Sequence, residues 1–200
     1  MIKNVVFDIG NVLINFKPFE FLRERFADEA VVQAVYSTIF ESKEWPELDR
    51  GTITEEQATE NFCRYCSEYE EEIRKVMREW HSMLTPIEAT VDIFKELKQK
   101  GYKIYVLSNY HMKAFESTYN NNEFFKLADG MVVSHRINML KPEPEIYDFL
   151  LKEYSLNAQE TLFIDDTLAN VEGANKAGIE TIFFKSAEAL REKLKGLKLL

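Results

Sequence analysis

The sequence predicts an α/β protein in which a Rossmann-like parallel sheet is interrupted near its start by an inserted helical cap. Residues Val5 to Phe7 form a short apolar run, which suits a strand buried on both faces. From Thr85 onward, similar runs alternate with amphipathic helical segments, the order typical of a parallel sheet with crossover helices. Between them the apolar spacing is helical throughout. We therefore predict a core of residues 1–14 and 85–200 and a helical cap of residues 15–84.

The inserted segment is predicted to be a small helical bundle. Apolar residues recur at helical spacing from Phe19 to Phe26, and again from Val31 to Ile39. Thr54 to Gln57 has the capping-box sequence that begins a helix, and the apolar spacing then continues to Val76. The pair Cys63 and Cys66 lies inside this pattern. Without a second pair it cannot form a structural zinc site, so we expect two ordinary thiols on one helix.

The remaining elements follow as alternating helices and strands. Thr85-Pro86-Ile87-Glu88 predicts a capping box with proline at the first helical position, and Gly101 is expected to end that helix. A further helix is expected after Lys141-Pro142, another closes at Gly178, and a last one carries Leu190, Leu194 and Leu197. Strands are expected over residues 104–107, 131–133, 161–164 and 181–184.

Composition excludes several classes of function. The net charge of −9 argues against a nucleic-acid-binding protein, which would need a basic face. No stretch approaches the length of a membrane-spanning helix. Two cysteines, and a start that runs from Met1 straight into the first strand without room for a signal peptide, favour a cytoplasmic protein. The oligomeric state cannot be predicted from these features.

Polar residues stand at, or just beyond, the carboxyl ends of four predicted strands. Right-handed crossovers bring these ends to one edge of the sheet, where open α/β sheets bind ligands. Each polar residue alone could also be a helix cap, a turn or a surface charge, but their coincidence favours a site. The residues are Asp8, Ser108 and Asn109, Lys141, and Asp165 and Asp166.

The chemistry of this set favours phosphoryl transfer with Mg²⁺. Two facing acidic groups repel unless a cation lies between them, and oxygen ligands without a nearby His or Cys favour a hard ion such as Mg²⁺. Asp8 could then attack phosphorus to form an aspartyl-phosphate. Lys141 would offset negative charge, while Ser108 and Asn109 would hold the phosphoryl oxygens.

The cap could add residues to this site. Gly51 marks a turn that could dip toward the sheet edge. Arg50 is the substrate-binding candidate, and Trp45 and Asp49 could also face the site. An ordinary surface loop explains the same residues equally well.

Four short motifs resemble those of the haloacid dehalogenase superfamily. They are Phe7–Val12, Leu107–Asn109, Lys141-Pro142 and Ile164–Asp166. The helical insertion resembles the type C1 cap of subfamily I. The Asp-x-Gly-Asn form and the paired aspartates are similar to a bacterial subgroup that includes an α-D-glucose-1-phosphate phosphatase.

This resemblance implies specific roles and a specific sheet. Asp8 would be the nucleophile and a metal ligand, and Asp166 and the carbonyl oxygen of Gly10 would complete the Mg²⁺ ligands, with Asp165 supporting them. Gly10 is also expected to make the tight turn after the first strand. The implied strand order is five, four, one, two, three.

One position departs from the pattern of most phosphatases in that superfamily. They carry a second Asp two residues after the nucleophile as general acid and base, a role worth ~10²–10⁴-fold, and here that position is Gly10. Three functions therefore stay open: a Mg²⁺-dependent phosphatase of a small phosphorylated metabolite such as a sugar 1-phosphate, a metal-independent 2-haloacid dehalogenase, and a catalytically weak binding or regulatory protein. The paired aspartates favour the first, because a metal-free site gains little from extra negative charge.

Overall fold

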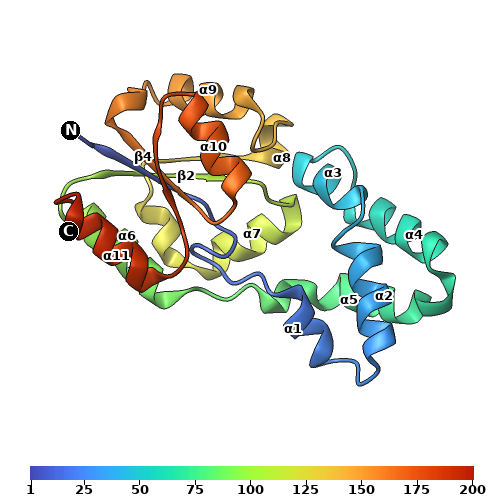
Figure 1. The fold of residues 1–200 in the computed structure, drawn as a ribbon. Coiled ribbons are helices and arrows are strands. Elements are labelled where there is room, and N and C mark those ends of the chain that lie inside the picture. The colour runs from blue at the N-terminus through green and yellow to red at the C-terminus, as the bar shows by residue number, and fades with distance from the viewer.

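The core of the protein is a five-stranded parallel sheet in the order β3-β2-β1-β4-β5 (Figure 1), the order that the resemblance of the motifs implies. The computed structural model describes all residues from 1 to 200. The strands are β1 (Asn4–Phe7), β2 (Lys103–Ser108), β3 (Gly130–Val133), β4 (Thr161–Asp165) and β5 (Glu180–Phe183). β1 lies between β2 and β4, with Phe7 paired to Val106 and Ile164. The ends of these three strands therefore lie side by side.

Helices cover both faces of this sheet (Figure 1). Val5 and Phe7 point to one face, where they share a core with residues of α6 and α11, while Val6 points to the other, against α9 and α10. This alternation follows from the period of two along a strand. Because both faces are buried, the middle of β1, from Val5 to Phe7, is wholly apolar. The core helices are α6 (Glu88–Gln99), α7 (Met112–Asn121), α8 (Ser134–Ile137), α9 (Pro144–Glu153), α10 (Leu168–Lys176) and α11 (Ala187–Gly196), with short 3-10 turns η3 (Glu123–Leu127) and η4 (Ala158–Glu160).

The start of α6 differs from the prediction. The helix begins at Glu88 after Ile87, without a capping side chain, so the predicted capping box at Thr85 is wrong. The carbonyl and hydroxyl oxygens of Thr85 instead accept hydrogen bonds from the side chain of Asn15 at 3.2 and 3.1 Å. Pro86 pairs with Ile14. These residues tie together the two chain segments that enter and leave the insertion, and this long-range pairing takes precedence over the local capping signal.

The insertion is entirely helical and lies beside the core (Figure 1). It contains α1 (Pro18–Arg23), α2 (Glu29–Ile39), α3 (Glu44–Arg50), α4 (Glu55–Tyr65) and α5 (Glu70–Glu79), with 3-10 turns η1 (Ser67–Tyr69) and η2 (Trp80–Met83). The capping box at Thr54 and Gln57 is confirmed, with both reciprocal hydrogen bonds present. None of the helices in the molecule is long and apolar enough to cross a membrane.

The helical pattern predicted to continue to Val76 is divided in the structure. α4 ends at Tyr65, and Cys66 takes φ −137° as its cap, after which α5 packs back against α4. The expectation that both cysteines lie on one helix is therefore wrong, although both are free thiols: Cys63 is buried in α4 and Cys66 follows its end. Apolar spacing is preserved across the break, which is why the sequence pattern did not reveal it.

Candidate active site

The loop after β1 presents Asp8 at the sheet edge. The Asp8 backbone N–H donates to the carbonyl of Ile164 at 2.9 Å, so the residue continues the pairing with β4 before the chain turns. The left-handed residue of this turn is Asn11, with φ 52°, and Gly10 has no positive φ. Gly10 lies in this turn as predicted, since the Val12 N–H donates to the Ile9 carbonyl at 3.3 Å across Gly10 and Asn11, but the left-handed conformation is taken by Asn11. Gly10 lines the cavity, and a Cβ placed on it would meet no atom within 4 Å.

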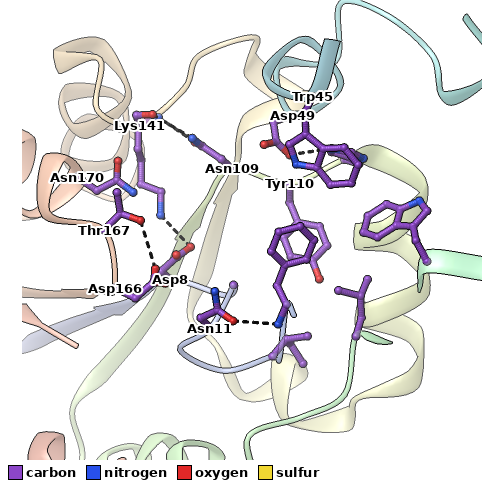
Figure 2. Close-up of a pocket in the computed structure, with 16 residues that line it drawn as sticks. Asp8, Asn11, Trp45, Asp49, Asn109, Tyr110, Lys141, Asp166, Thr167 and Asn170 are labelled. Atoms are coloured by element: carbon purple, nitrogen blue, oxygen red, sulfur yellow. Dashed lines mark hydrogen bonds and ion pairs between the residues drawn. The ribbon is translucent and has the colours of Figure 1, made fainter. Parts of the chain in front are cut away.

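Lys141 links the nucleophile candidate to the acidic pair. Its ammonium nitrogen lies 2.8 Å from Oδ1 of Asp8 and 2.6 Å from Oδ2 of Asp165. The Asn109 side chain fixes the lysine backbone, because its amide nitrogen donates to the Lys141 carbonyl at 3.0 Å and its oxygen accepts from the Lys141 N–H at 2.8 Å (Figure 2). The Asn109 amide is thus occupied in holding Lys141.

The two aspartates after β4 have different surroundings. Asp165 is fully buried, and it accepts hydrogen bonds from the Thr167 N–H at 2.8 Å and from the Asn170 amide at 3.1 and 3.2 Å, besides its bond from Lys141. Asp166 lines the cavity. Oxygen atoms of Asp8, Asp165 and Asp166 all lie within 4.8 Å of one another. Asp165 therefore orients the cluster, and Asp8 and Asp166 face the ligand space.

The electrostatics of this cluster suit a bound cation. Burial, together with the charges of Asp165 and Asp166, raises the pKa of Asp8 to about 7 even though Lys141 opposes the rise. Burial and the charge of Asp165 also raise the pKa of Asp166. Burial disfavours the charged form of Lys141, but Asp8 and Asp165 outweigh it and raise the pKa of that ammonium. One ammonium leaves three carboxylates undercompensated, and Oδ1 of Asp8 lacks a donor of good hydrogen-bond geometry, so this donor set fits a hard divalent ion.

These residues open into a cavity of about 220 Å³ whose two halves differ in character. The sheet-edge half is polar and is formed by Asp8, Asn109, Lys141, Asp166, Thr167 and Asn170. The half toward the cap is largely apolar and is formed by Ile14, Phe16, Trp45, Trp80, Leu84 and Tyr110. Figure 2 shows Asp8 and Lys141 on one side and Trp45 and Asp49 on the other. A charged group can therefore bind at the sheet while an apolar surface binds at the cap.

The sequence reasoning named neither the aromatic residues Phe16, Trp80 and Tyr110 nor His111 as residues of this cavity. His111 lines it, three residues beyond the end of β2, although no His was expected nearby. Its Nε2 atom lies 3.2 Å from Oδ1 of Asp49 in α3. His111 follows Ser108 and Asn109 closely at the end of β2, and this position could have identified it as a site residue. Its pairing with Asp49 depends on how the cap packs, which the sequence does not show.

Two predicted site residues do not join the others. The Arg50 guanidinium forms a two-point ion pair with Glu143, with N–O distances of 2.5 and 3.1 Å, and Arg50 does not line the cavity. Its helix neighbours Trp45 and Asp49 do. Ser108 is buried, and its hydroxyl lies 3.4 Å from the Asn109 carbonyl. α3 thus faces the site, through side chains other than Arg50.

Comparison with known proteins places the chain in a family. Residues 5–184 match the haloacid dehalogenase-like hydrolases. The chain belongs to this family. The resemblance inferred from the motifs is confirmed, and the motif residues Asp8, Lys141, Asp165 and Asp166 are the ones gathered at the sheet edge.

Members of the family that resemble this chain carry different activities. A sesquiterpene phosphatase of Aspergillus oryzae is 28% identical over 177 residues, which cover 88% of this chain and 87% of that protein. A D-ribitol-5-phosphate phosphatase of Bacteroides thetaiotaomicron is 25% identical over 207 residues and 97% of each chain.

Solved structures of the family show the same fold. A family enzyme of Bacteroides thetaiotaomicron, in complex with magnesium and inorganic phosphate, superposes with a TM-score of 0.68 at 23% identity, over 92% of this chain and 95% of that one. The L-2-haloacid dehalogenase of Xanthobacter autotrophicus superposes with a TM-score of 0.68 at 20% identity, over 100% of this chain and 85% of that one. The fold is therefore common to a dehalogenase and to an enzyme that binds magnesium and phosphate, so the fold alone does not assign a reaction.

Proposed function

We propose that this protein is a Mg²⁺-dependent phosphatase that hydrolyses a small phosphorylated metabolite through an aspartyl-phosphate intermediate. The observation that carries the proposal is the cluster of Asp8, Asp165 and Asp166 around Lys141, with carboxylate oxygens within 4.8 Å of one another. Phosphatase relatives that align over most of the chain support it.

The metal site of the proposal consists of Asp8, Asp166 and the carbonyl oxygen of Gly10, with Asp165 as the supporting carboxylate. Oxygen donors of this kind suit Mg²⁺, and a magnesium and phosphate complex of a family enzyme with this fold is consistent with it. When bound, the ion would neutralise charge on the phosphoryl oxygens.

The roles of the chain's own residues follow from their contacts. Asp8 attacks phosphorus because it is the carboxylate that faces the cavity from the central strand. Lys141 holds Asp8 in position and offsets charge on the phosphoryl group. Asn109 is a positioning residue for Lys141. Arg50, engaged with Glu143, is better explained as a link between cap and core than as a substrate ligand.

The dehalogenase alternative accounts less well for the site. A haloacid carries its own negative charge, and a metal-free site would place that charge against Asp8, Asp165 and Asp166. Repulsion between like charges at these distances is costly in a buried site. The acidic cluster therefore favours a metal-assisted reaction on phosphate.

The substrate class follows from the apolar half of the cavity. Trp45, Trp80 and Phe16 would contact the group that carries the phosphate, and aromatic side chains favour flat or apolar surfaces. A sugar 1-phosphate could place one face of its ring against these side chains. A sesquiterpene phosphate, the class named for one relative, could place an isoprenoid chain there. A screen that includes sugar 1-phosphates, sugar 6-phosphates and isoprenoid phosphates separates these classes.

The free thiols Cys63 and Cys66 suit a reducing cytoplasm.

The proposed function predicts a metal-dependent hydrolysis of p-nitrophenyl phosphate. EDTA should abolish turnover and Mg²⁺ should restore it, while Asp8→Asn should remove it without unfolding the protein because the amide is nearly isosteric but a poor nucleophile. Asp148→Asn, on the exposed side of α9, is the matched control. Full turnover in EDTA, or chloride release from 2-chloropropionate without metal, would favour the dehalogenase instead.

A further inference from the structure

The cavity contains few groups that could carry a proton to a leaving oxygen. Asp8 and Asp166 belong to the proposed metal site, and Lys141 is held as an ammonium between two carboxylates. The Tyr110 hydroxyl forms a hydrogen bond of 3.2 Å with the Thr118 hydroxyl in α7, so it is already engaged within the core. Asp49 is the remaining carboxyl group that lines the cavity.

Contacts between α3 and the core hold Asp49 over the sheet edge. The backbone carbonyl of Asp49 accepts a hydrogen bond from the Ser134 hydroxyl. Arg50 donates to the Asn138 carbonyl at 3.1 Å, and the Asn138 amide donates back to the Arg50 carbonyl at 2.8 Å. The Arg50–Glu143 ion pair adds a further link. These contacts fix the backbone of a cap residue to the core that it faces.

His111 provides an independent observation that points to the same place. Only 3% of it is exposed to solvent, and neither ring nitrogen has a hydrogen-bond partner of good geometry. The ring packs against Trp45 and Trp80, with centroid distances of 4.3 and 5.2 Å, and directs Nε2 toward Asp49 at 3.2 Å. A buried imidazole left incompletely bonded is costly in a purely structural role.

The surroundings determine which member of the pair carries the proton. Burial, with the nearby charge of Asp8, raises the pKa of Asp49 to about 8, against a smaller opposing effect of Lys141. Burial, with His81 and His135 nearby, lowers the pKa of His111 to about 3. The other charged group facing His111 is Glu55 of α4, 4.0 Å from Nδ1, which also lies 3.0 Å from His81. Near neutral pH, Asp49 is thus a carboxylic acid beside a neutral imidazole.

We propose that Asp49, supplied by the cap and oriented by His111, is the general acid and base of the reaction. This inference rests on the proposed phosphatase function. As Asp8 attacks phosphorus, the bond from phosphorus to the leaving oxygen breaks, and that oxygen takes the proton of Asp49. Asp49, now a carboxylate, then accepts a proton from water as the water oxygen attacks phosphorus. The bond to Asp8 breaks, inorganic phosphate leaves, and both aspartates return to their starting states.

The test compares two substrates that differ in their need for the proton. Phenyl phosphate releases a strongly basic phenolate, whereas p-nitrophenyl phosphate releases a weakly basic one that leaves without protonation. With Mg²⁺ present, Asp49→Asn should lower kcat/KM for phenyl phosphate by ~10²–10⁴-fold, the usual size of general acid–base help, and change kcat/KM for p-nitrophenyl phosphate far less. Glu47→Gln, on the same helix but outside the cavity, should change neither. We compare kcat/KM because it reports the steps up to departure of the leaving group and not the later hydrolysis of the aspartyl-phosphate, which is common to both esters.

A second measurement needs no variant. In the unmodified protein, the ratio of kcat/KM for phenyl phosphate to kcat/KM for p-nitrophenyl phosphate should fall as the pH rises through the raised pKa of Asp49, because the acid form of Asp49 is lost. Titration of Asp8 and changes in metal binding alter the rates for both substrates, so their effects cancel in the ratio.

The outcomes separate this inference from the proposed function. An Asp49→Asn protein whose kcat/KM falls equally for both esters, or for neither, would overturn the role of Asp49. A pH-independent ratio would overturn it as well. Failure of the unmodified protein to hydrolyse either ester with Mg²⁺ would instead reject the phosphatase proposal itself.

Discussion

At the scale of single residues, Lys141 is the centre of the site. Its ammonium is buried and contacts Asp8 and Asp165, of which Asp165 has no exposure to solvent. Buried charges of this kind are tolerated because each compensates another and the remaining oxygens are hydrogen-bonded. The same contacts that stabilise the charges also fix the direction of the nucleophile, so stability and catalysis depend on one side chain.

Lys141→Met tests this dependence. Removing one partner leaves buried carboxylates unpaired, a change that costs about 3–5 kcal/mol, so the free energy of unfolding by urea should fall by that amount and turnover should vanish. Lys113→Met removes a half-exposed lysine that pairs with Glu56, and it should change stability by about 0.5 kcal/mol or less. Equal unfolding midpoints for the two variants would contradict the role of Lys141.

The polar residues at or beyond the carboxyl ends of strands were predictable from the sequence. Asp8, Lys141 and Asp166 could be placed together because the topology of a parallel sheet brings its carboxyl strand ends to one edge. Asp49 and His111 could not be paired in this way, since their contact depends on how α3 docks against the core. Arg50 was chosen from the right helix, but its side chain turns to Glu143, and residue type alone does not specify direction.

At the scale of elements, the important contact is between α3 and α8. Gly51 ends α3 with φ 77°, a left-handed conformation that favours glycine. It also lies so close to α8 that an added Cβ would be 2.7 Å from the carbonyl oxygen of His135. This close approach allows the cap helix to place Trp45 and Asp49 in the cavity.

Gly51→Ala should therefore loosen the cap. The left-handed conformation alone costs roughly 1–2 kcal/mol for a residue with a side chain, and the clash with His135 adds to that cost. We expect a lower thermal midpoint and a raised KM, because the apolar wall moves away from the sheet. Gly196→Ala, in α11 where a Cβ meets no atom within 4 Å, should be neutral or slightly stabilising. An unchanged midpoint for Gly51→Ala would show that the docking is not tight.

Local sequence signals gave the existence of elements more reliably than their ends. The capping box at Thr54 forms as predicted, with the Thr54 hydroxyl accepting from the Gln57 N–H. The similar signal at Thr85 does not form a capping box. There the Asn15 side chain binds Thr85 instead, where the two chain segments between cap and core lie side by side. The break at Cys66 also escaped detection, since α4 and α5 present apolar faces with matching periods to the same interior.

At the scale of the whole molecule, the buried acids couple folding to pH. The pKa of Asp49 is about 8 in the folded protein, against an ordinary value of 3.8. Between these values the folded chain holds a proton that the unfolded chain has released. The contribution of Asp49 to stability is thus fully present below its ordinary pKa and is lost as the pH rises through the folded one.

Asp49→Asn should flatten this dependence. In EDTA, the free energy of unfolding of the unmodified protein should decline between pH ~5 and ~8, with Asp49 contributing up to about 1.4 kcal/mol per pH unit. An amide does not titrate, so the Asp49→Asn curve should decline less steeply, and the two curves should separate progressively toward pH ~8. Urea denaturation at several pH values measures both slopes, and Glu47→Gln should run parallel to the unmodified protein. Parallel curves for Asp49→Asn as well would mean that Asp49 is ionised when folded, and the proton proposed for the leaving oxygen would then have to come from another group.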